Sequence, residues 1–152
     1  MNRAFFPVVT SFFVAVLALS SVAHAADAPK AGPAKADPAK GEALYTNGDA
    51  ARNITACVSC HGWTGESPIS PFATLTGARA ANDPTATNVA QIVLWGTMRH
   101  NPPDALSMPA FGNAYSDDEI AAVANYVTAR FGSKGSKLTA KDVAELREQT
   151  SQ

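Results

Sequence analysis

The stretch Cys57-Val58-Ser59-Cys60-His61 carries the only two cysteines of the chain. On one helical turn, thiols at positions i and i+3 can both reach the vinyl groups of a porphyrin, and the adjacent imidazole can then bind the iron. Cys57 and Cys60 are therefore the predicted attachment residues of one haem c, and His61 is its predicted proximal ligand. Attachment leaves no thiol for a disulfide or for a structural zinc site, which typically needs four ligands.

Two other interpretations of the cysteine pair compete with haem attachment. A redox-active dithiol has the same Cys-x-x-Cys spacing, but thioredoxin-like motifs lie in a βαβ pattern that this sequence lacks. A disulfide between Cys57 and Cys60 would close so short a loop that it would stabilise the fold little. We therefore favour haem attachment over both.

The composition limits the kind of protein that this chain forms. Its 152 residues are 46% hydrophobic, which fits one modest domain with its own core. Only 16% of the residues are charged and the formal net charge is -1, so the basic surface that nucleic-acid binding requires is not indicated. We expect no nucleic-acid partner.

The first residues have the pattern of an export signal. Arg3 precedes an apolar run over 5–19, and small residues follow up to Ala23-His24-Ala25, which is typical of a cleavage site. We predict a signal peptide over 1–25, a periplasmic protein, and no stable membrane span after cleavage. An uncleaved anchor is the alternative. The next segment, 26–37, is predicted to be a flexible leader because it is rich in Ala, Pro and Lys and has no large apolar residue.

Helical signals follow the leader, and no convincing alternation typical of strands appears. Asp37-Pro38 is typical of an N-cap with proline at the first helical position, so we predict a helix over 38–46. Residues 56–61 are predicted to form one helical turn. The expected fold class is all-α.

Two longer helices are predicted in the second half of the chain. Asp83-Pro84-Thr85 indicates the start of one, and Gly96 its end. Ser116 and Glu119 form a capping box at the start of the other. Apolar residues then recur at helical spacing, at Ile120, Val123, Ala124, Val127 and Phe131.

The last residues loosely repeat the capping pattern. Thr139 and Asp142 stand in place of the capping pair, and Val143 and Leu146 give the next helix an apolar face. We therefore assign a haem domain to 38–136 and a C-terminal amphipathic tail helix to 137–152.

A haem that carries electrons needs a second axial ligand, and Met108 is our choice for it. Such a ligand must descend from a loop, and the proline after Met108 stiffens the chain there. His100, Met98 and an open site are the alternatives, whereas His24 would leave with the signal peptide. The predicted metal ligands are thus His61 and Met108.

Together these motifs resemble the class I cytochrome c family over about residues 39–131. The resemblance rests on Gly41-x-x-x-Tyr45, Cys57-x-x-Cys60-His61-Gly62, Met108-Pro109-x-Phe111 and the helix around Tyr126. It implies three to five helices around one covalently attached haem. It also implies that the first and last helices of the domain cross, with Gly41 close to the aromatic side chain of Tyr126.

One segment departs from the family pattern. The family often has Pro-x-Leu-x-Gly after the attachment site, where the carbonyl of the proline accepts a hydrogen bond from the proximal histidine. Here the segment reads Ala73-Thr74-Leu75-Thr76-Gly77, with alanine in place of proline. A main-chain carbonyl can still orient the His61 ring, but the sequence does not indicate which residue supplies it.

The C-terminal half narrows the resemblance to haem domains of cytochrome subunits that serve periplasmic alcohol and aldehyde dehydrogenases. This narrower resemblance rests on Trp95-Gly96-Thr97, Met108-Pro109-Ala110-Phe111 and the stretches 118–127 and 138–146. The predicted function is that of an electron carrier without enzyme activity, with a periplasmic dehydrogenase as donor and a terminal oxidase or another cytochrome as acceptor. The alternatives are a dedicated subunit of one dehydrogenase and a haem enzyme with a labile distal ligand. Apolar residues expected to line the haem pocket are Leu75, Val93, Leu94, Trp95, Phe111 and Ile120.

Overall fold

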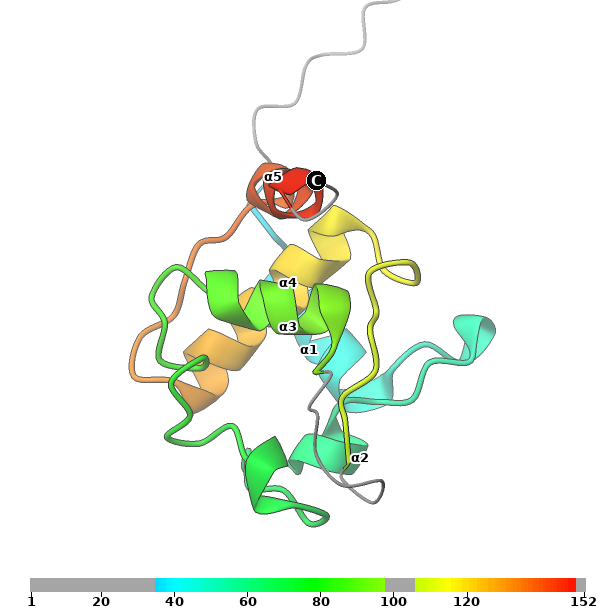
Figure 1. The fold of residues 1–152 in the computed structure, drawn as a ribbon, viewed down its shortest axis with the longest axis vertical. Helices are drawn as coiled ribbons and strands as arrows, with labels where there is room; N and C mark the ends of the chain where they lie inside the picture. Colours follow the sequence, from blue (N-terminus) through cyan, green and yellow to red (C-terminus); the bar gives the residue numbers. More distant parts are fainter. Residues whose placement is uncertain (1–34, 98–105, 150–152) are drawn as a thin grey trace, which may run out of the picture. The chain divides into compact units, whose positions relative to one another are not determined.

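The computed structural model describes residues 35–97 and 106–149, which form an all-α fold (Figure 1). The helices are α1 (Pro38–Asn47), α2 (Val58–His61), α3 (Thr87–Trp95), α4 (Asp117–Phe131) and α5 (Ala140–Gln149), with 3-10 turns over Ala50–Arg52 and Pro71–Ala73. The predicted fold class is confirmed. The predicted signal peptide, 1–25, and the predicted leader up to residue 34 lie outside the described residues. None of the described helices is long and apolar enough to cross a membrane.

Helix α1 begins where its cap was predicted. The Asp37 carboxylate accepts a hydrogen bond from the Ala39 N–H at 2.9 Å, and Pro38 occupies the first turn. The helix runs one residue beyond the predicted 38–46. It ends at Gly48, whose N–H donates to the Leu44 carbonyl at 3.1 Å.

Helices α1 and α4 approach each other closely at Gly41. A Cβ atom on this glycine would lie 2.2 Å from the Ala122 carbonyl oxygen and 3.0 Å from the Tyr126 Cβ. The predicted pairing of Gly41 with Tyr126 is confirmed, although the tightest contact is with the main chain of Ala122. Tyr45, one turn further along α1, packs its ring 5.3 Å from that of Tyr126 and 5.2 Å from that of Phe131, measured between centroids. Because Gly41 has no side chain, α1 and α4 lie close enough for these three aromatic rings to pack against one another.

Helix α4 has the predicted capping box. The Glu119 N–H donates to Ser116 Oγ at 3.3 Å, and the Ser116 N–H donates to the Glu119 carboxylate at 2.9 Å. Arg52 from the loop after α1 also binds this carboxylate, at 2.8 Å. Its hydrogen bond is the main cause that holds the pKa of Glu119 at about 2. One carboxylate therefore caps α4 and anchors the loop between α1 and α2.

Helix α3 begins later than the sequence predicted. Instead of starting a helix, Asp83 closes a turn, because its carboxylate accepts hydrogen bonds from the N–H groups of Thr85 and Asn88. Ala86 then adopts a left-handed conformation with φ of 59°, so regular helix begins only at Thr87. The predicted end at Gly96 is confirmed.

Helix α5 packs on α3 and α4 through its apolar face, with Val143 and Leu146 buried (Figure 1). The predicted cap is present, since the Thr139 N–H donates to the Asp142 carboxylate at 2.8 Å and the Asp142 N–H returns a bond to Thr139 Oγ1 at 3.3 Å. Near its end, Arg147 donates hydrogen bonds to the Asp117 carboxylate and to the carbonyls of residues 112 and 115. The tail helix is therefore joined to the start of α4.

Candidate functional site

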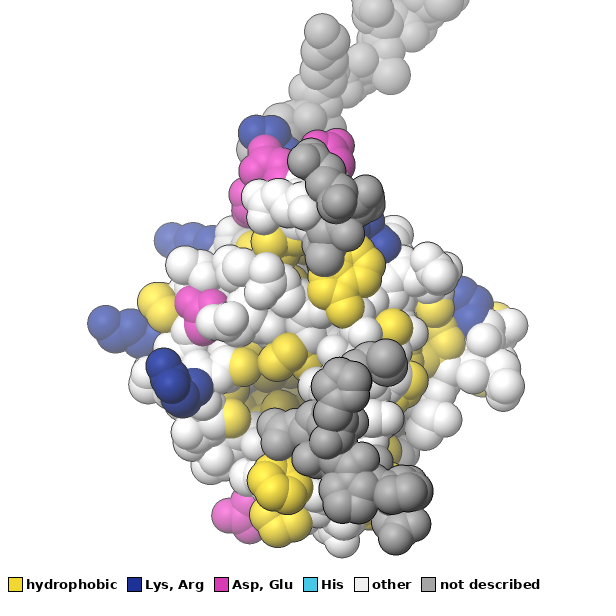
Figure 2. Space-filling view, viewed as in Figure 1, with side chains coloured by type: hydrophobic (Ala, Val, Ile, Leu, Met, Phe, Trp, Pro, Cys, Tyr) yellow, Lys and Arg dark blue, Asp and Glu magenta, His cyan; other side chains and the backbone are white. Residues whose placement is uncertain are grey.

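A cavity of about 300 Å³ contains all four residues predicted from the sequence. Cys57, Cys60 and His61 line it from α2 and the residue before it, and Met108 lines it from the segment that precedes α4. Figure 2 shows hydrophobic side chains gathered around a hollow in this face, below α3. The fold thus brings together residues that are about fifty positions apart in the sequence.

Helix α2 is the single turn that the spacing of the cysteines requires. The Cys57 carbonyl accepts hydrogen bonds from the N–H groups of Cys60 at 3.1 Å and of His61 at 2.9 Å. Both thiols are free in the structure. Cys57 is half-buried, and this burial raises the pKa of its thiol to about 11, whereas Cys60 is exposed. Tyr45 Oη donates to the Gly62 carbonyl at 2.7 Å and so holds the end of this turn against α1.

The His61 ring is held by a main-chain carbonyl. His61 Nδ1 lies 2.6 Å from the Ala73 carbonyl oxygen. Because a carbonyl can only accept, Nδ1 carries the proton and Nε2 keeps a lone pair for a metal. Ala73 stands where the family pattern often has proline, and its carbonyl is the acceptor for the His61 ring. The sequence alone did not indicate which residue would supply this carbonyl. Orientation of a ligating histidine by such a bond also raises its basicity.

Ser67 joins the histidine turn to the carbonyl that orients it. Its hydroxyl donates to the Cys60 carbonyl at 2.6 Å and accepts from the N–H groups of Ile69 at 3.2 Å and Ser70 at 3.1 Å. The chain then turns at Pro71–Ala73, which places the Ala73 carbonyl at the ring. Sequence reasoning missed this serine, since a loop serine before a proline carries no signal beyond turn formation.

Met108 enters the cavity from a segment that runs along the end of α3. The Phe111 N–H donates to the Val93 carbonyl at 2.9 Å, and the Gly112 N–H to the Leu94 carbonyl at 3.0 Å. These carbonyls belong to the last turn of α3 and have no partner within the helix. Met108 itself is half-buried and packs against the core. The alternative ligands Met98 and His100 lie outside the described residues.

The apolar wall of the cavity agrees only in part with prediction. Leu75, Val93 and Phe111 line it. Leu94 and Ile120 do not, because each is fully buried in the helix-helix core, and Trp95 points outward with 39% of its surface exposed. The helices α3 and α4 instead contribute other apolar residues, which are Val89, Ile92, Val123 and Val127.

Three apolar side chains at the rim of the cavity were not predicted. Ile69, Phe72 and Leu106 line the cavity while exposing 47%, 77% and 63% of their surface. All three lie outside the α-helices, so helical periodicity could not reveal them. The sequence did offer one signal for these rim residues, which is that they are large and apolar in segments otherwise rich in Gly, Pro and Ser.

The chemistry of this cavity fits a haem. Two thiols, an imidazole with a free Nε2 and a thioether are the groups that bind haem c. The wall is mainly apolar, and the volume falls within the range of about 300–1,000 Å³ typical of cofactor sites. No carboxylate, lysine or arginine among the described residues lines the cavity.

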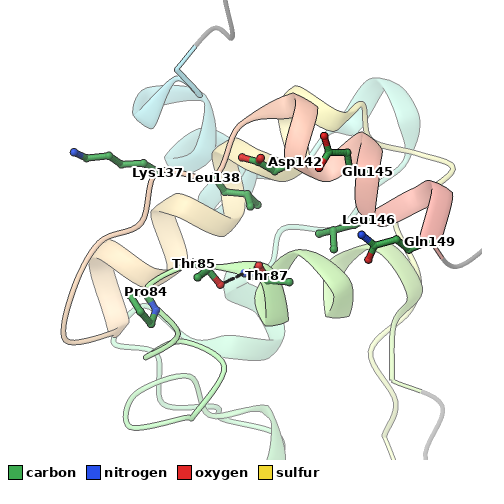
Figure 3. Close-up of a pocket in the computed structure, with 9 residues that line it drawn as sticks. All are labelled: Pro84, Thr85, Thr87, Lys137, Leu138, Asp142, Glu145, Leu146 and Gln149. Carbon is green, nitrogen blue, oxygen red and sulfur yellow. Dashed lines mark hydrogen bonds between the residues drawn. The ribbon is translucent and has the colours of Figure 1, made fainter.

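A second hollow, of about 550 Å³, lies between α5 and the turn before α3 (Figure 3). The residues around it are Pro84, Thr85, Thr87, Lys137, Leu138, Asp142, Glu145, Leu146 and Gln149. The hydroxyls of Thr85 and Thr87 form a hydrogen bond of 2.9 Å at its edge. Because its lining contains neither sulfur nor imidazole, it offers no ligand of the kind that haem iron uses.

Comparison with known proteins gives one family match and two relatives. The family described as Cytochrome c matches residues 38–130. The gluconate 2-dehydrogenase cytochrome c subunit of Pantoea cypripedii is 38% identical over 103 residues, which are 62% of this chain and 22% of that protein. The thiosulfate dehydrogenase electron acceptor of Stutzerimonas stutzeri (strain A1501) is 35% identical over 127 residues, 82% of this chain and 54% of that protein. The chain therefore spans about a fifth of the first relative and about half of the second.

Proposed function

Because this chain belongs to the cytochrome c family, we propose that it carries single electrons between a donor protein and an acceptor protein. Its cofactor is the covalently bound haem c of that family, which supplies a one-electron ferric/ferrous couple. The observation that carries this proposal is the convergence of two thiols, an oriented imidazole and a methionine on one apolar cavity.

In this proposal each residue of the cavity has a distinct part. Cys57 and Cys60 hold the haem through thioether bonds, and His61 and Met108 bind the iron. The Ala73 carbonyl fixes the ring and the tautomer of His61. The apolar wall keeps water away, and its low dielectric favours the less charged ferrous form.

The lining of the cavity favours electron transfer over catalysis. A haem enzyme needs a distal acid or base, or a position that substrate can occupy. Among the described residues, the titratable groups of the cavity are those of Tyr45, Cys57, Cys60 and His61. The two cysteines and the histidine are assigned to the haem, and the Tyr45 hydroxyl is bound to a carbonyl. With Met108 in the sixth position, no titratable group remains for acid-base chemistry among the described residues that line the cavity.

The names of the relatives support the choice of donor, and the acceptor is part of the same proposal. One relative is named as a cytochrome c subunit of a dehydrogenase, and the other as an electron acceptor of a dehydrogenase. We propose a dehydrogenase as donor, a terminal oxidase or another cytochrome as acceptor, and the periplasm as location, because of the export pattern over 1–25. The alternative is a dedicated subunit of one dehydrogenase, as the first relative is named.

Spectroscopy of single variants tests the ligands. Ferric haem with His and Met ligands has a weak near-red absorption band, which we expect in the wild type and not in Met108→Ala. The variants Met98→Ala and His100→Ala are the matched controls and should keep the band. If the wild type lacks the band, or if a control variant loses it while Met108→Ala keeps it, the assignment of Met108 is wrong.

Mass spectrometry and fractionation test the rest of the proposal. A haem-bearing peptide that contains residues 57–61 is expected, and Cys57→Ala and Cys60→Ala should each leave at most one thioether bond. Release by osmotic shock should yield a processed chain. Elution of the native protein apart from any large oxidoreductase supports a free carrier, whereas stoichiometric co-elution with one would instead establish a dedicated subunit.

A further inference from the structure

We propose that Thr97 is a positioning residue. It binds both the N–H and the carbonyl of Met108 and thereby keeps exogenous ligands from displacing that methionine. This inference rests on the proposed function, in which Met108 is an axial ligand. It assigns a role to a residue for which the sequence motifs imply none. Thr97 follows the end of α3, is half-buried and lines the cavity beside Met108.

Two hydrogen bonds join these residues. The Thr97 N–H donates to the Met108 carbonyl at 3.0 Å, and the Met108 N–H donates to Thr97 Oγ1 at 2.9 Å. Both polar groups of the Met108 main chain are thus bound by a single residue. The next residue, Pro109, has no N–H and cannot add a bond of its own. The position of Met108 therefore depends strongly on Thr97.

Gly96 allows the two segments to approach closely enough for these bonds. It has a φ of 70°, and a Cβ atom on it would lie 2.4 Å from the Met108 carbonyl oxygen. Any larger residue here would push the Met108 segment away from α3. The glycine that ends α3 thus also brings the chain of Met108 into contact with Thr97.

The hydroxyl of Thr97 is the part of this contact that a substitution can remove. Of the four hydrogen bonds described between residues 93–97 and 108–112, three join main-chain groups and only the bond to Thr97 Oγ1 uses a side chain. Thr97→Val replaces the hydroxyl by a methyl group of similar shape, and Thr97→Ser keeps the hydroxyl. The pair therefore separates the hydrogen bond from the packing of the residue.

Displacement of Met108 by imidazole measures the effect. When an exogenous ligand takes the sixth position, the Met108 segment must move, and the bonds to Thr97 oppose this movement. Loss of one such bond is expected to raise the affinity of the ferric protein for imidazole about fivefold in Thr97→Val. Thr97→Ser should bind imidazole as the wild type does. Thr97→Ala lacks the hydroxyl as well and serves if Thr97→Val yields no haem-loaded protein.

The outcomes distinguish this inference from the function on which it rests. If the wild type has no near-red band, Met108 is not a ligand and the proposed function fails at that point. If the band is present but Thr97→Val binds imidazole with wild-type affinity, the positioning role is wrong. Equal increases in Thr97→Val and Thr97→Ser would also overturn it, because the hydroxyl would not be the cause. Wild-type affinity in Thr97→Ser with increased affinity in Thr97→Val supports it.

Discussion

Substitution of Gly41 by alanine is expected to destabilise the fold although alanine is the better helix former. Its methyl group would lie 2.2 Å from the Ala122 carbonyl oxygen, where ordinary contact begins at 3.4 Å. The helices α1 and α4 must therefore separate by about 1 Å, which costs about 1–3 kcal/mol in overpacking. Helix propensity returns about 1 kcal/mol. Overall, we expect a loss of about 1 kcal/mol and a melting temperature lower by about 4 °C.

Ala43→Gly is the matched control for this substitution, because Ala43 is exposed on the same helix. It removes about 1 kcal/mol of helix propensity without touching α4. Both variants are compared with the wild type by thermal unfolding of the haem-loaded ferric protein. An increase in the stability of Gly41→Ala by the amount that Ala43→Gly loses would refute the close approach, since propensity alone would then explain both.

Three further substitutions test contacts around the site and the tail helix. Ser67→Ala removes the hydroxyl that joins Cys60 to residues 69 and 70, so it should cost about 1–2 kcal/mol in thermal unfolding, while Ser59→Ala, at an exposed position, should cost almost nothing. Equal losses would contradict the role of Ser67. Arg147→Met should lower stability and speed hydrogen exchange in α5, whereas removal of the exposed ion pair in Lys141→Met should change neither. Glu119→Gln should cost about 1 kcal/mol at neutral pH, because Arg52 at the protein surface holds the Glu119 pKa at about 2, below its ordinary 4.5. Because the pKa of Glu119 is lowered in the folded state, its ionised carboxylate stabilises the fold fully above pH 4.5. The difference in stability between Glu119→Gln and the wild type should therefore shrink as the pH falls from 4.5 to 2. A difference that stays constant over this range would exclude the ion pair as its source.

The helix ends that could be predicted from the sequence are those fixed by local chemistry. Asp37 before Pro38, and Ser116 with Glu119, each act on N–H groups within three residues, so short motifs contain the whole interaction. Asp83 before Pro84 presents nearly the same pattern and makes the same local bond, to the Thr85 N–H, but its carboxylate also binds Asn88, five residues away, and closes a turn before α3 begins. Nothing nearby in the sequence separates these two uses of an aspartate.

Features that depend on how helices face the cavity could not be predicted. Leu94 and Val93 are adjacent on α3, yet only Val93 lines the cavity, because successive residues on a helix point about 100° apart. The acceptor for His61 was hidden for a different reason. It is the main-chain carbonyl of Ala73, and every residue has such a group, so only the path of the chain selects it.

Cys57, Cys60, His61 and Met108 were predicted from spacing and context alone, and all four line one cavity. Their roles as attachment residues and ligands stay predictions. Mass spectrometry of the haem-bearing peptide can detect the thioether bonds, and the absorption spectrum can identify the axial ligands.

A redox titration followed by absorption tests single-electron transfer by this site most directly. The purified wild type should titrate as one reversible couple with the slope of a one-electron process, and the near-red band of the ferric form should disappear in step with reduction. The midpoint should be unaffected by added imidazole at concentrations that leave Met108 bound. A slope that requires more than one electron, or a ferric form without the near-red band, would contradict a single haem held by His61 and Met108.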